Sequence, residues 1–348
     1  MTAPLAFLRH NVTKVLTGIA IALLAGAPMM GASVYVIVVL TSVLAYALLA
    51  MSINFVAGHA GLLTLAHAAY AGVGAYAVVL VSRQGTTNAL AQLIVAVTAG
   101  TLIAAVTGWI AVRASKTYFL MLSLAIGELL HILAVQWRQV THGSDGLSAG
   151  APFDLGGGPI VLTGYVYWLS LVVFLIFGGA VLVVVHSPFG AALRGIRENE
   201  PRMRGLGYPT PRYKYMAWVF SGTVAGASGW MLVAQLPRFI APSQLSFHLA
   251  GLLLLAVVIG GLGSMWGACL GAAVVVVMTD VVSQDLGGRG PLLLGVLFVL
   301  AVYALPRGLA GIGKGAPQRE RADRPHSGEG GIPGDLVGDT AAKQVSER

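Results

Sequence analysis

The sequence predicts an all-α, polytopic integral membrane protein. Of its 348 residues, 57% are apolar and only 10% are charged, and the mean hydropathy is +0.82. A soluble domain usually carries about 25% charged and about 45–50% apolar residues. The composition therefore excludes a soluble enzyme, a disordered protein and a disulfide-stabilised secreted domain. The apolar runs are long and continuous, whereas the strands of a membrane barrel would alternate over about ten residues.

The apolar runs predict about ten transmembrane helices, within a range of eight to ten. A helix needs roughly 20 mainly apolar residues to cross a bilayer. We expect the spans near 15–30, 34–55, 62–81, 90–112, 117–136, 164–185, 214–236, 248–261, 265–283 and 290–305. Residues 1–30 also resemble a signal peptide, because two basic residues precede the apolar run. We expect a retained helix, since no soluble segment follows for a signal to export.

The basic residues predict the orientation of the chain. If every span crosses, ten of the basic residues before Arg307 lie on the side of the N-terminus and four lie on the other side. The positive-inside rule then places both termini in the cytosol. Beyond Leu309 the chain is rich in Gly, Pro, Ser and charge. We therefore expect a transmembrane domain over residues 1–309 and a disordered cytosolic tail over residues 310–348.

Glycines mark close helix packing and two expected breaks. One stripe repeats every fourth residue from Gly263 to Gly271, and Gly222 and Gly226 form a shorter one, which indicates packing within one subunit or a dimer interface. Residues 58–76 and 260–267 combine glycine with polar residues near membrane depth, as broken or re-entrant helices beside transport pathways do. A tight cytosolic turn is the alternative. The glycines expected to break or pack helices are Gly58, Gly61, Gly72, Gly74, Gly260, Gly261, Gly263, Gly267 and Gly271.

The longest polar stretch within the apolar region is 187–207, on the predicted cytosolic side. Ser187 and Pro188 suit the N-cap and first turn of a helix. Its apolar residues recur at helical spacing, and a second short helix is expected to start just before Pro201. The stretch is either a solvated loop whose arginines follow the positive-inside rule, or an amphipathic helix that presents an apolar surface to a cytosolic partner. The apolar stripe consists of Phe189, Leu193 and Ile196.

Few ionisable residues lie inside the spans. Glu128 lies in the middle of one, and His131 follows on the same helix face. A buried carboxylate costs roughly 2.5–3.5 kcal/mol on insertion scales unless it is paired or hydrated, so Glu128 is a candidate for the translocation pathway. A structural hydrogen bond is the alternative. His67 fits the packing of small residues, and the three residues lack metal-ligand spacing, so we expect no metal.

The chain contains no motif for covalent chemistry or for binding ATP. Residues 308–315 nearly match a phosphate-binding loop, but Gly315 replaces the Ser or Thr that binds magnesium, and no strand is expected before the loop. No nucleophile elbow or Cys/His cluster occurs, and the basic excess is explained by topology rather than by nucleic-acid binding. We therefore expect a protein that is not an enzyme and holds no cofactor.

Several motifs, taken in order, resemble the branched-chain amino-acid ABC transporter permease family, in particular its LivM-type subunit. Residues 58–76 are similar to the family's segment with a Gly-x-x-Gly start and a His-Ala centre. The matching motifs that follow are Tyr118-Phe119, Gly127-Glu128, Gly143–Leu147, Ser187–Gly190, Arg197–Glu200 and Gly260–Ser264. The resemblance covers about residues 35–305. Pro201 departs from the family, in which the helix continues past the acidic pair.

The resemblance implies a permease subunit of an ATP-binding-cassette importer, which translocates branched-chain amino acids across the bacterial inner membrane by alternating access. The implied partners are a second homologous permease, two cytosolic ATPase subunits that bind the ATP, a periplasmic or lipid-anchored binding protein, and membrane lipid. Urea or short-chain amides are alternative substrates within the family. A secondary transporter driven by an ion gradient is the alternative from another class.

The resemblance also assigns residues to roles. It implies that residues 187–213 are the ATPase-coupling loop, formed by Pro188, Phe189, Gly190, Leu193, Arg194, Arg197, Glu198, Asn199 and Glu200. The candidates for the translocation pathway are His67, Glu128 and His131.

Overall fold

The structure is a computed structural model that describes residues 33–114, 116–149, 153–154, 159–160, 163–235 and 238–282, together with six isolated positions between 292 and 303. The expected first span, most of the last span and the expected cytosolic tail lie outside the described residues. The boundary between a transmembrane domain and a tail therefore stays a prediction.

The described chain is almost entirely helical. Its helices are α2 (Val34–Phe55), the π-helical η2 (Val56–Ala60), α3 (His67–Arg83), α4 (Ala89–Ala111), α5 (Lys116–Gln136), α6 (Arg138–Thr141), the 3-10 helix η3 (Gly143–Asp145), α7 (Thr163–His186), α8 (Pro188–Glu198), α9 (Glu200–Gly205), α10 (Thr210–Ala234), the 3-10 helix η4 (Pro242–Leu245), α11 (Phe247–Gly260), α12 (Met265–Val276) and the π-helical η5 (Val277–Val282).

In the part of the chain that the structure describes, four two-residue strands form two small antiparallel pairs. The strands are β1 (Leu147–Ser148), β2 (Phe153–Asp154), β3 (Pro159–Ile160) and β4 (Phe239–Ile240). Leu147 of β1 lies opposite Ile240 of β4, and Phe153 of β2 lies opposite Ile160 of β3.

The predicted all-α membrane fold is confirmed. Six helical segments of the described chain are long and apolar enough to cross a membrane, and they are Val34–Ala60, Ala89–Ala111, Tyr118–Gln136, Gly164–His186, Thr210–Ala234 and Met265–Val282. Two further expected spans are shorter helices: α3 has 17 residues and α11 has 14. Since a helix rises about 1.5 Å per residue, α3 is only about 26 Å long. These eight segments correspond to the eight central spans that the sequence predicts.

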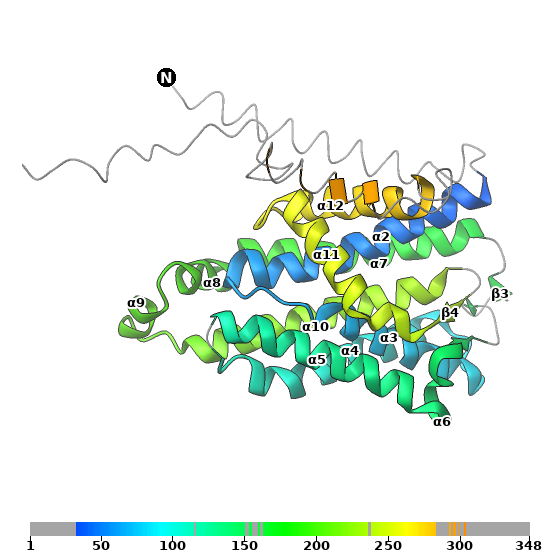
Figure 1. Ribbon diagram of the computed structural model, residues 1–348, viewed down its shortest axis with the longest axis horizontal. Coiled ribbons are helices and arrows are strands. Elements are labelled where there is room, and N and C mark those ends of the chain that lie inside the picture. The colour runs from blue at the N-terminus through cyan, green and yellow to red at the C-terminus, as the bar shows by residue number, and fades with distance from the viewer. Residues whose placement is uncertain are drawn as a thin grey trace, which may run out of the picture. The chain divides into compact units, whose positions relative to one another are not determined.

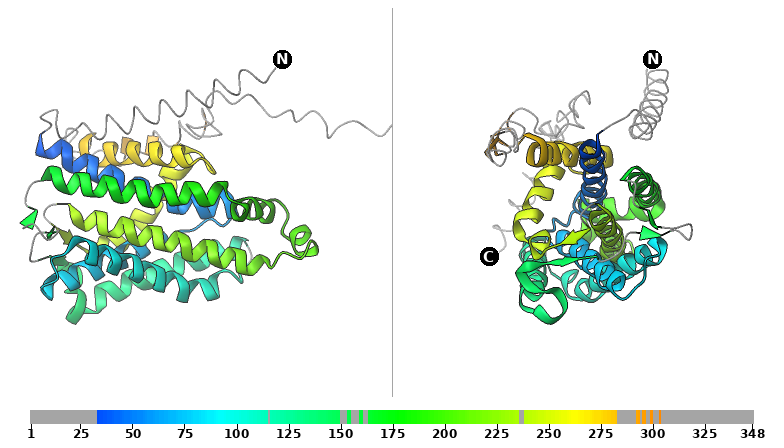
Figure 2. Two further views of the ribbon diagram at one scale, coloured as in Figure 1. Left: turned by 180° about the vertical axis from the view of Figure 1, so that it is seen from behind. Right: turned by 90° about the vertical axis from the view of Figure 1, so that its right-hand side faces the viewer.

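The helices lie side by side, and α8 and α9 lie at one end of the bundle (Figure 1). We call this end the α8 end. The paired strands β1 and β4 lie at the opposite end. Figure 2 shows α10 running through the middle of the bundle when seen end-on. In the most apolar 18-residue stretch of α10, 78% is buried inside the protein. The corresponding share is 28% for α4 and for α5. The exposed side chains of α4 are mostly apolar, as lipid contact requires, and include Leu90, Ile94, Leu102 and Val106.

Small residues bring the helix backbones into close contact within this chain. A Cβ on Gly222 would clash with Ala104 of α4, and one on Gly226 would lie against the carbonyl oxygen of Ala96. Gly72 and Gly74 lie inside α3, where they face Leu245 and the backbone of α10 respectively. This geometry supports packing within one subunit for these glycines.

The predicted glycine stripe at residues 263–271 is only partly correct. Gly267 and Gly271 lie on α12, where they pack against the backbone of α11 at Gly260 and Ala256. Gly263 does not extend this stripe, because its φ of +87° places it in the turn before α12. Glycine adopts that backbone conformation without the steric penalty that a side chain would add.

Candidate functional site

The first expected helix break is present. The helix that begins at Val34 widens into the π-helical η2 and ends at Gly61, whose φ is +71°. The residues between Gly61 and His67 are not helical, and α3 begins at His67. π-Helical segments are rare and often occur at functional sites.

Most of this first break lies inside the bundle: Leu62, Thr64 and Ala66 are buried, whereas Leu63 is 38% exposed. Leu65 donates its backbone N–H to Ser123 Oγ, in the first half of α5, at 3.2 Å. His67 bonds through Nδ1 to Thr64 Oγ1 at 3.2 Å and through Nε2 to Ser221 Oγ at 2.8 Å. Ser221 lies near the middle of α10. Non-helical backbone at such a depth needs protein around it, and here neighbouring side chains supply its hydrogen bonds.

The second break separates α11 from α12. It begins after Gly260 and contains two residues with positive φ, Gly261 at +103° and Gly263 at +87°. Ser264 then caps α12, because its Oγ accepts a hydrogen bond from Gly267 N at 3.2 Å. The expected break at 260–267 is therefore present as well.

Asn54 joins the two breaks. Its Nδ2 donates to Ser264 O at 2.7 Å, and its Oδ1 accepts from Gly263 N at 2.8 Å. The side chain is fully buried at the end of α2. Gly58 packs directly against Gly263, since a Cβ on Gly58 would lie 2.9 Å from Asn54 Oδ1 and closer still to the Gly263 backbone. The two breaks, more than 200 residues apart in sequence, are thus in direct contact.

Sequence reasoning did not single out Asn54. The available signal was a polar amide at the end of an apolar run, just before a glycine-rich stretch. A buried amide of this kind must find hydrogen-bond partners, which makes it a candidate to cap nearby irregular backbone.

Helix α8 contacts the first break through Arg197. Its Nη1 donates a hydrogen bond to the carbonyl oxygen of Gly58. The aliphatic part of Arg197 lies over Gly61, where an added Cβ would be 2.8 Å from Arg197 Cγ. Helix α8, at the end of the bundle, is therefore bonded to the first break. The region of the first break is in turn bonded to the second break through Asn54. We call this set of contacts, made by Arg197, Gly58, Asn54, Gly263 and Ser264, the α8–break junction.

The apolar stripe of α8 faces the protein interior. Leu193 and Ile196 are buried, at 0% and 1% exposure. Phe189 is half-buried and stacks on Tyr213 of α10, with the ring centroids 5.5 Å apart. The stripe therefore does not present an apolar surface to a partner, as a docking helix was expected to do. Helix periodicity identified the face correctly, but the face packs against the chain's own helices.

The start of α8 and the restart after it agree with the sequence prediction. Ser187 Oγ accepts a hydrogen bond from Gly190 N at 3.4 Å. Asn199 is extended between α8 and α9, and its Oδ1 accepts from Arg202 N at 3.0 Å. Pro201 lies in the first turn of α9, where its missing N–H leaves no helical hydrogen bond unmade.

Glu200 fixes α9 to the start of α10. Its carboxylate accepts hydrogen bonds from Lys214 Nζ at 2.5 Å, from Arg204 Nη2 at 2.7 Å and from Thr210 Oγ1 at 3.0 Å. Burial by itself would raise the pKa of Glu200, but the bonds from Lys214 and Arg204 outweigh burial and hold this pKa below its ordinary value. Glu200 is therefore ionised at neutral pH, and the α8–α9 segment is anchored to a membrane helix at this point.

The three pathway candidates do not come together in one site. His67 is fully buried between α3 and α10, with Trp218 and Tyr70 beside its ring. Glu128 and His131 bond to each other at 3.1 Å on a partly exposed face of α5. Within the described residues, no group of three or more His, Cys, Asp or Glu side chains is placed to hold a metal ion.

Comparisons with known proteins give a consistent result. The family model described as branched-chain amino acid transport system / permease component matches residues 35–305. The high-affinity branched-chain amino acid transport system permease protein LivM of Salmonella typhimurium is 29% identical over 301 residues, which cover 77% of this chain and 68% of that protein. LivM of Escherichia coli is 28% identical with the same coverage.

A third relative carries a different name. The L-arabinose ABC transporter permease protein AraH of Azospirillum brasilense is 28% identical over 193 residues, which cover 51% of this chain and 55% of AraH. No solved structure matches the chain significantly.

Proposed function

We propose that this chain, which belongs to the family of branched-chain amino acid transport system permease components, is the membrane subunit of an ATP-driven importer. In this proposal, the conformational change of the ATPase subunits displaces α8. The chain is a multi-pass protein of the inner membrane. Its substrates are branched-chain amino acids, and it moves them by alternating access.

The observation that carries this proposal is the α8–break junction. Arg197 bonds α8 to Gly58 in the first break, and Asn54 bonds that region to the second break. A displacement of α8 by a bound ATPase would therefore shift both breaks together. Because broken helices line transport pathways in many carriers, such a shift can open one side of a pathway and close the other.

The proposed partners are a second homologous permease, two ATPase subunits that bind ATP, and a periplasmic or lipid-anchored binding protein. The chain itself is proposed to hold no cofactor. Branched-chain amino acids are favoured over urea, amides or sugars because the names of both LivM relatives give that substrate. The matches to these two relatives cover more than two thirds of their length. His67, Glu128 and His131 remain proposed pathway residues.

The ATPase is proposed to contact α9 and its C-terminal turn, since the stripe of α8 is buried. Leu206 is 65% exposed there and Tyr208 is 40% exposed. Exposed apolar side chains of this kind act as anchors in protein interfaces.

Leu206→Asp should therefore lower the amount of ATPase that co-purifies with the permease at least tenfold, as expected for the loss of an interface anchor worth about 2 kcal/mol. Phe239→Asp, at the opposite end of the bundle, provides a matched control that should leave the ATPase bound. Stoichiometric ATPase in the Leu206→Asp preparation would contradict the proposed docking surface.

A further inference from the structure

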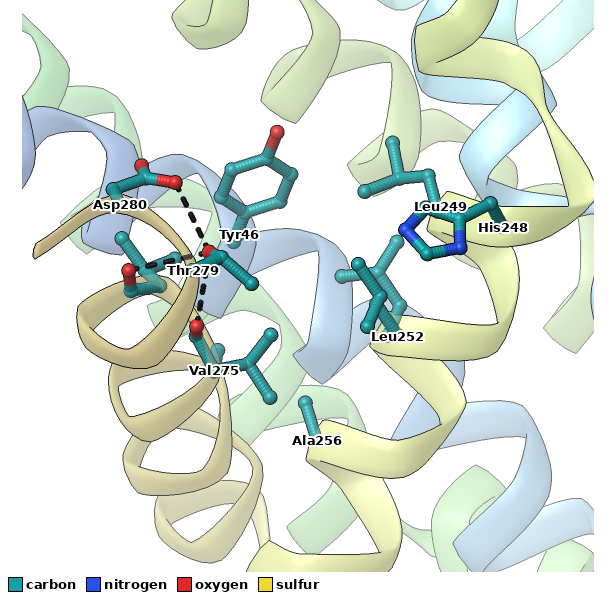
Figure 3. A pocket seen from close by; sticks show the side chains of 11 residues that line it. Tyr46, His248, Leu249, Leu252, Ala256, Val275, Thr279 and Asp280 are labelled. Atoms are coloured by element: carbon teal, nitrogen blue, oxygen red, sulfur yellow. Dashed lines mark hydrogen bonds between the residues drawn. The ribbon is translucent and has the colours of Figure 1, made fainter. Parts of the chain in front are cut away.

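A cavity of about 270 Å³ lies between α2, α11 and the last turns of α12 (Figure 3). It lies away from the α8–break junction. His248 is at the start of α11, and twelve residues separate it from Gly260, where α11 ends at the second break. At about 1.5 Å per residue, the two ends of α11 are about 18 Å apart. The His248 end of the cavity therefore lies toward the end of α11 that is farther from the second break.

Three polar residues line this cavity on one side, Tyr46, Thr279 and Asp280. Asp280 comes from the π-helical η5, and Tyr46 comes from α2 beside it (Figure 3). Asp280 Oδ1 lies 3.0 Å from the Thr279 hydroxyl, which has a single proton and also lies 3.0 Å from Val275 O and 3.3 Å from Val276 O. That one proton can satisfy only one of three acceptors, so it compensates the carboxylate weakly.

No basic side chain of the described chain forms an ion pair with Asp280. The three ion pairs found among the described residues are His131–Glu128, Arg204–Glu200 and Lys214–Glu200. A carboxylate at the wall of a membrane cavity is costly unless a cation or a strong donor compensates it. Its surroundings thus suit a ligand that brings its own positive charge.

The other side of the cavity offers an apolar wall and one further polar group. Leu249, Leu252 and Ala256 of α11 face Val275 of α12 across the cavity, and His248 lies at the far side from Asp280 (Figure 3). An imidazole N–H can donate to a carboxylate. Ligand pockets usually begin at about 300 Å³, so this cavity suits a ligand of about the size of one aliphatic amino acid.

We propose that this cavity is a substrate subsite for an aliphatic amino acid, which places its ammonium group on Asp280, its side chain on the leucine-lined wall and its carboxylate toward His248. This inference rests on the proposed function, since it assigns a place in the chain to the cargo. The two neighbouring residues Thr279 and Asp280 of the π-helical η5 both line this cavity, which supports the inference, since π-helical segments often occur at functional sites.

The test uses the fact that Cys269 is the single cysteine of the chain. In a Cys269→Ala background, Thr279→Cys places a thiol on the cavity wall, and Val277→Cys places one on the same segment outside the cavity. The assembled transporter in lipid discs is treated with a small thiol reagent, with or without L-leucine. We expect L-leucine to slow labelling of residue 279 at least fivefold and to leave labelling of residue 277 unchanged.

Analogues and charge variants test the assigned contacts. 4-Methylpentanoate, which lacks the ammonium group, should not protect residue 279. Asp280→Asn should raise the L-leucine concentration for half-protection about 10- to 100-fold, as expected for the loss of one charge-assisted hydrogen bond. Asp145→Asn, an exposed carboxylate outside the cavity, should leave it unchanged.

The outcomes separate this inference from the proposed function. If the unmodified transporter accumulates L-leucine with ATP but L-leucine leaves residue 279 unprotected, the subsite is wrong and the transport function stands. Equal protection by 4-methylpentanoate and by L-leucine would also overturn the role of Asp280. A transporter that does not move L-leucine at all contradicts the proposed function instead.

Discussion

Replacing Arg197 with alanine should reduce the number of substrate molecules moved per ATP at least tenfold, while the ATPase subunits still bind and hydrolyse ATP. Arg197 is the side chain through which α8 bonds to Gly58 in the first break. Its loss removes a hydrogen bond from a charged group, worth about 1.5–3 kcal/mol, and weakens the link between movement of α8 and movement of the break. The measurement is substrate uptake and phosphate release in the same proteoliposomes.

Arg202→Ala is the matched control for Arg197→Ala. Arg202 is an exposed arginine of α9, and its backbone N–H, which the substitution keeps, makes the capping bond to Asn199. We expect the number of molecules moved per ATP to stay at the wild-type value in this variant, even if ATPase binding weakens. An unchanged number of substrate molecules moved per ATP in Arg197→Ala would show that the bond between Arg197 and Gly58 does not couple ATP hydrolysis to transport.

Gly58→Ala should destabilise the protein and abolish uptake, although alanine is the better helix former. In an ordinary helix interior, replacing glycine by alanine stabilises by about 1 kcal/mol. Here the added methyl group would collide with the backbone of Gly263 and crowd Asn54 Oδ1, so the two breaks would have to separate. Overpacking of this kind costs about 1–3 kcal/mol. The measurements are the apparent unfolding temperature in detergent and substrate uptake.

Gly251→Ala provides the control for this prediction. Gly251 also lies in a helix, α11, and an added Cβ there meets no atom of the protein within 4 Å. The apparent unfolding temperature of the Gly251→Ala variant should equal that of the wild-type protein or lie slightly above it. Equal unfolding temperatures and equal uptake for Gly58→Ala and Gly251→Ala would contradict the close contact between the breaks.

Local features of the sequence predicted most of the described fold. Hydropathy gave the eight central spans, because crossing a bilayer demands long apolar runs. Ser187 and Pro188 predicted the start of α8, and the polar glycine-rich stretches predicted both breaks, because those residues act through local backbone geometry. The same locality explains why the second short helix was expected just before Pro201.

The features that sequence reasoning missed depend on contacts between distant segments. The bonds of Asn54 span about 210 residues, and the bond of Arg197 to Gly58 spans 139 residues. The stripe of α8 was visible, but periodicity does not say whether its apolar face meets a partner or the chain's own helices. Only the packing of α2, α11 and η5 shows that Asp280 faces a cavity.

Uptake of labelled L-leucine into proteoliposomes tests whether this chain is the membrane subunit of an ATP-driven importer of branched-chain amino acids. The liposomes contain this chain with its proposed permease partner, ATPases and binding protein. We expect accumulation against the gradient only when ATP is present in the compartment where the ATPases lie, and a clear preference for L-leucine over urea. Accumulation driven by a proton or sodium gradient without the ATPase subunits would contradict the account.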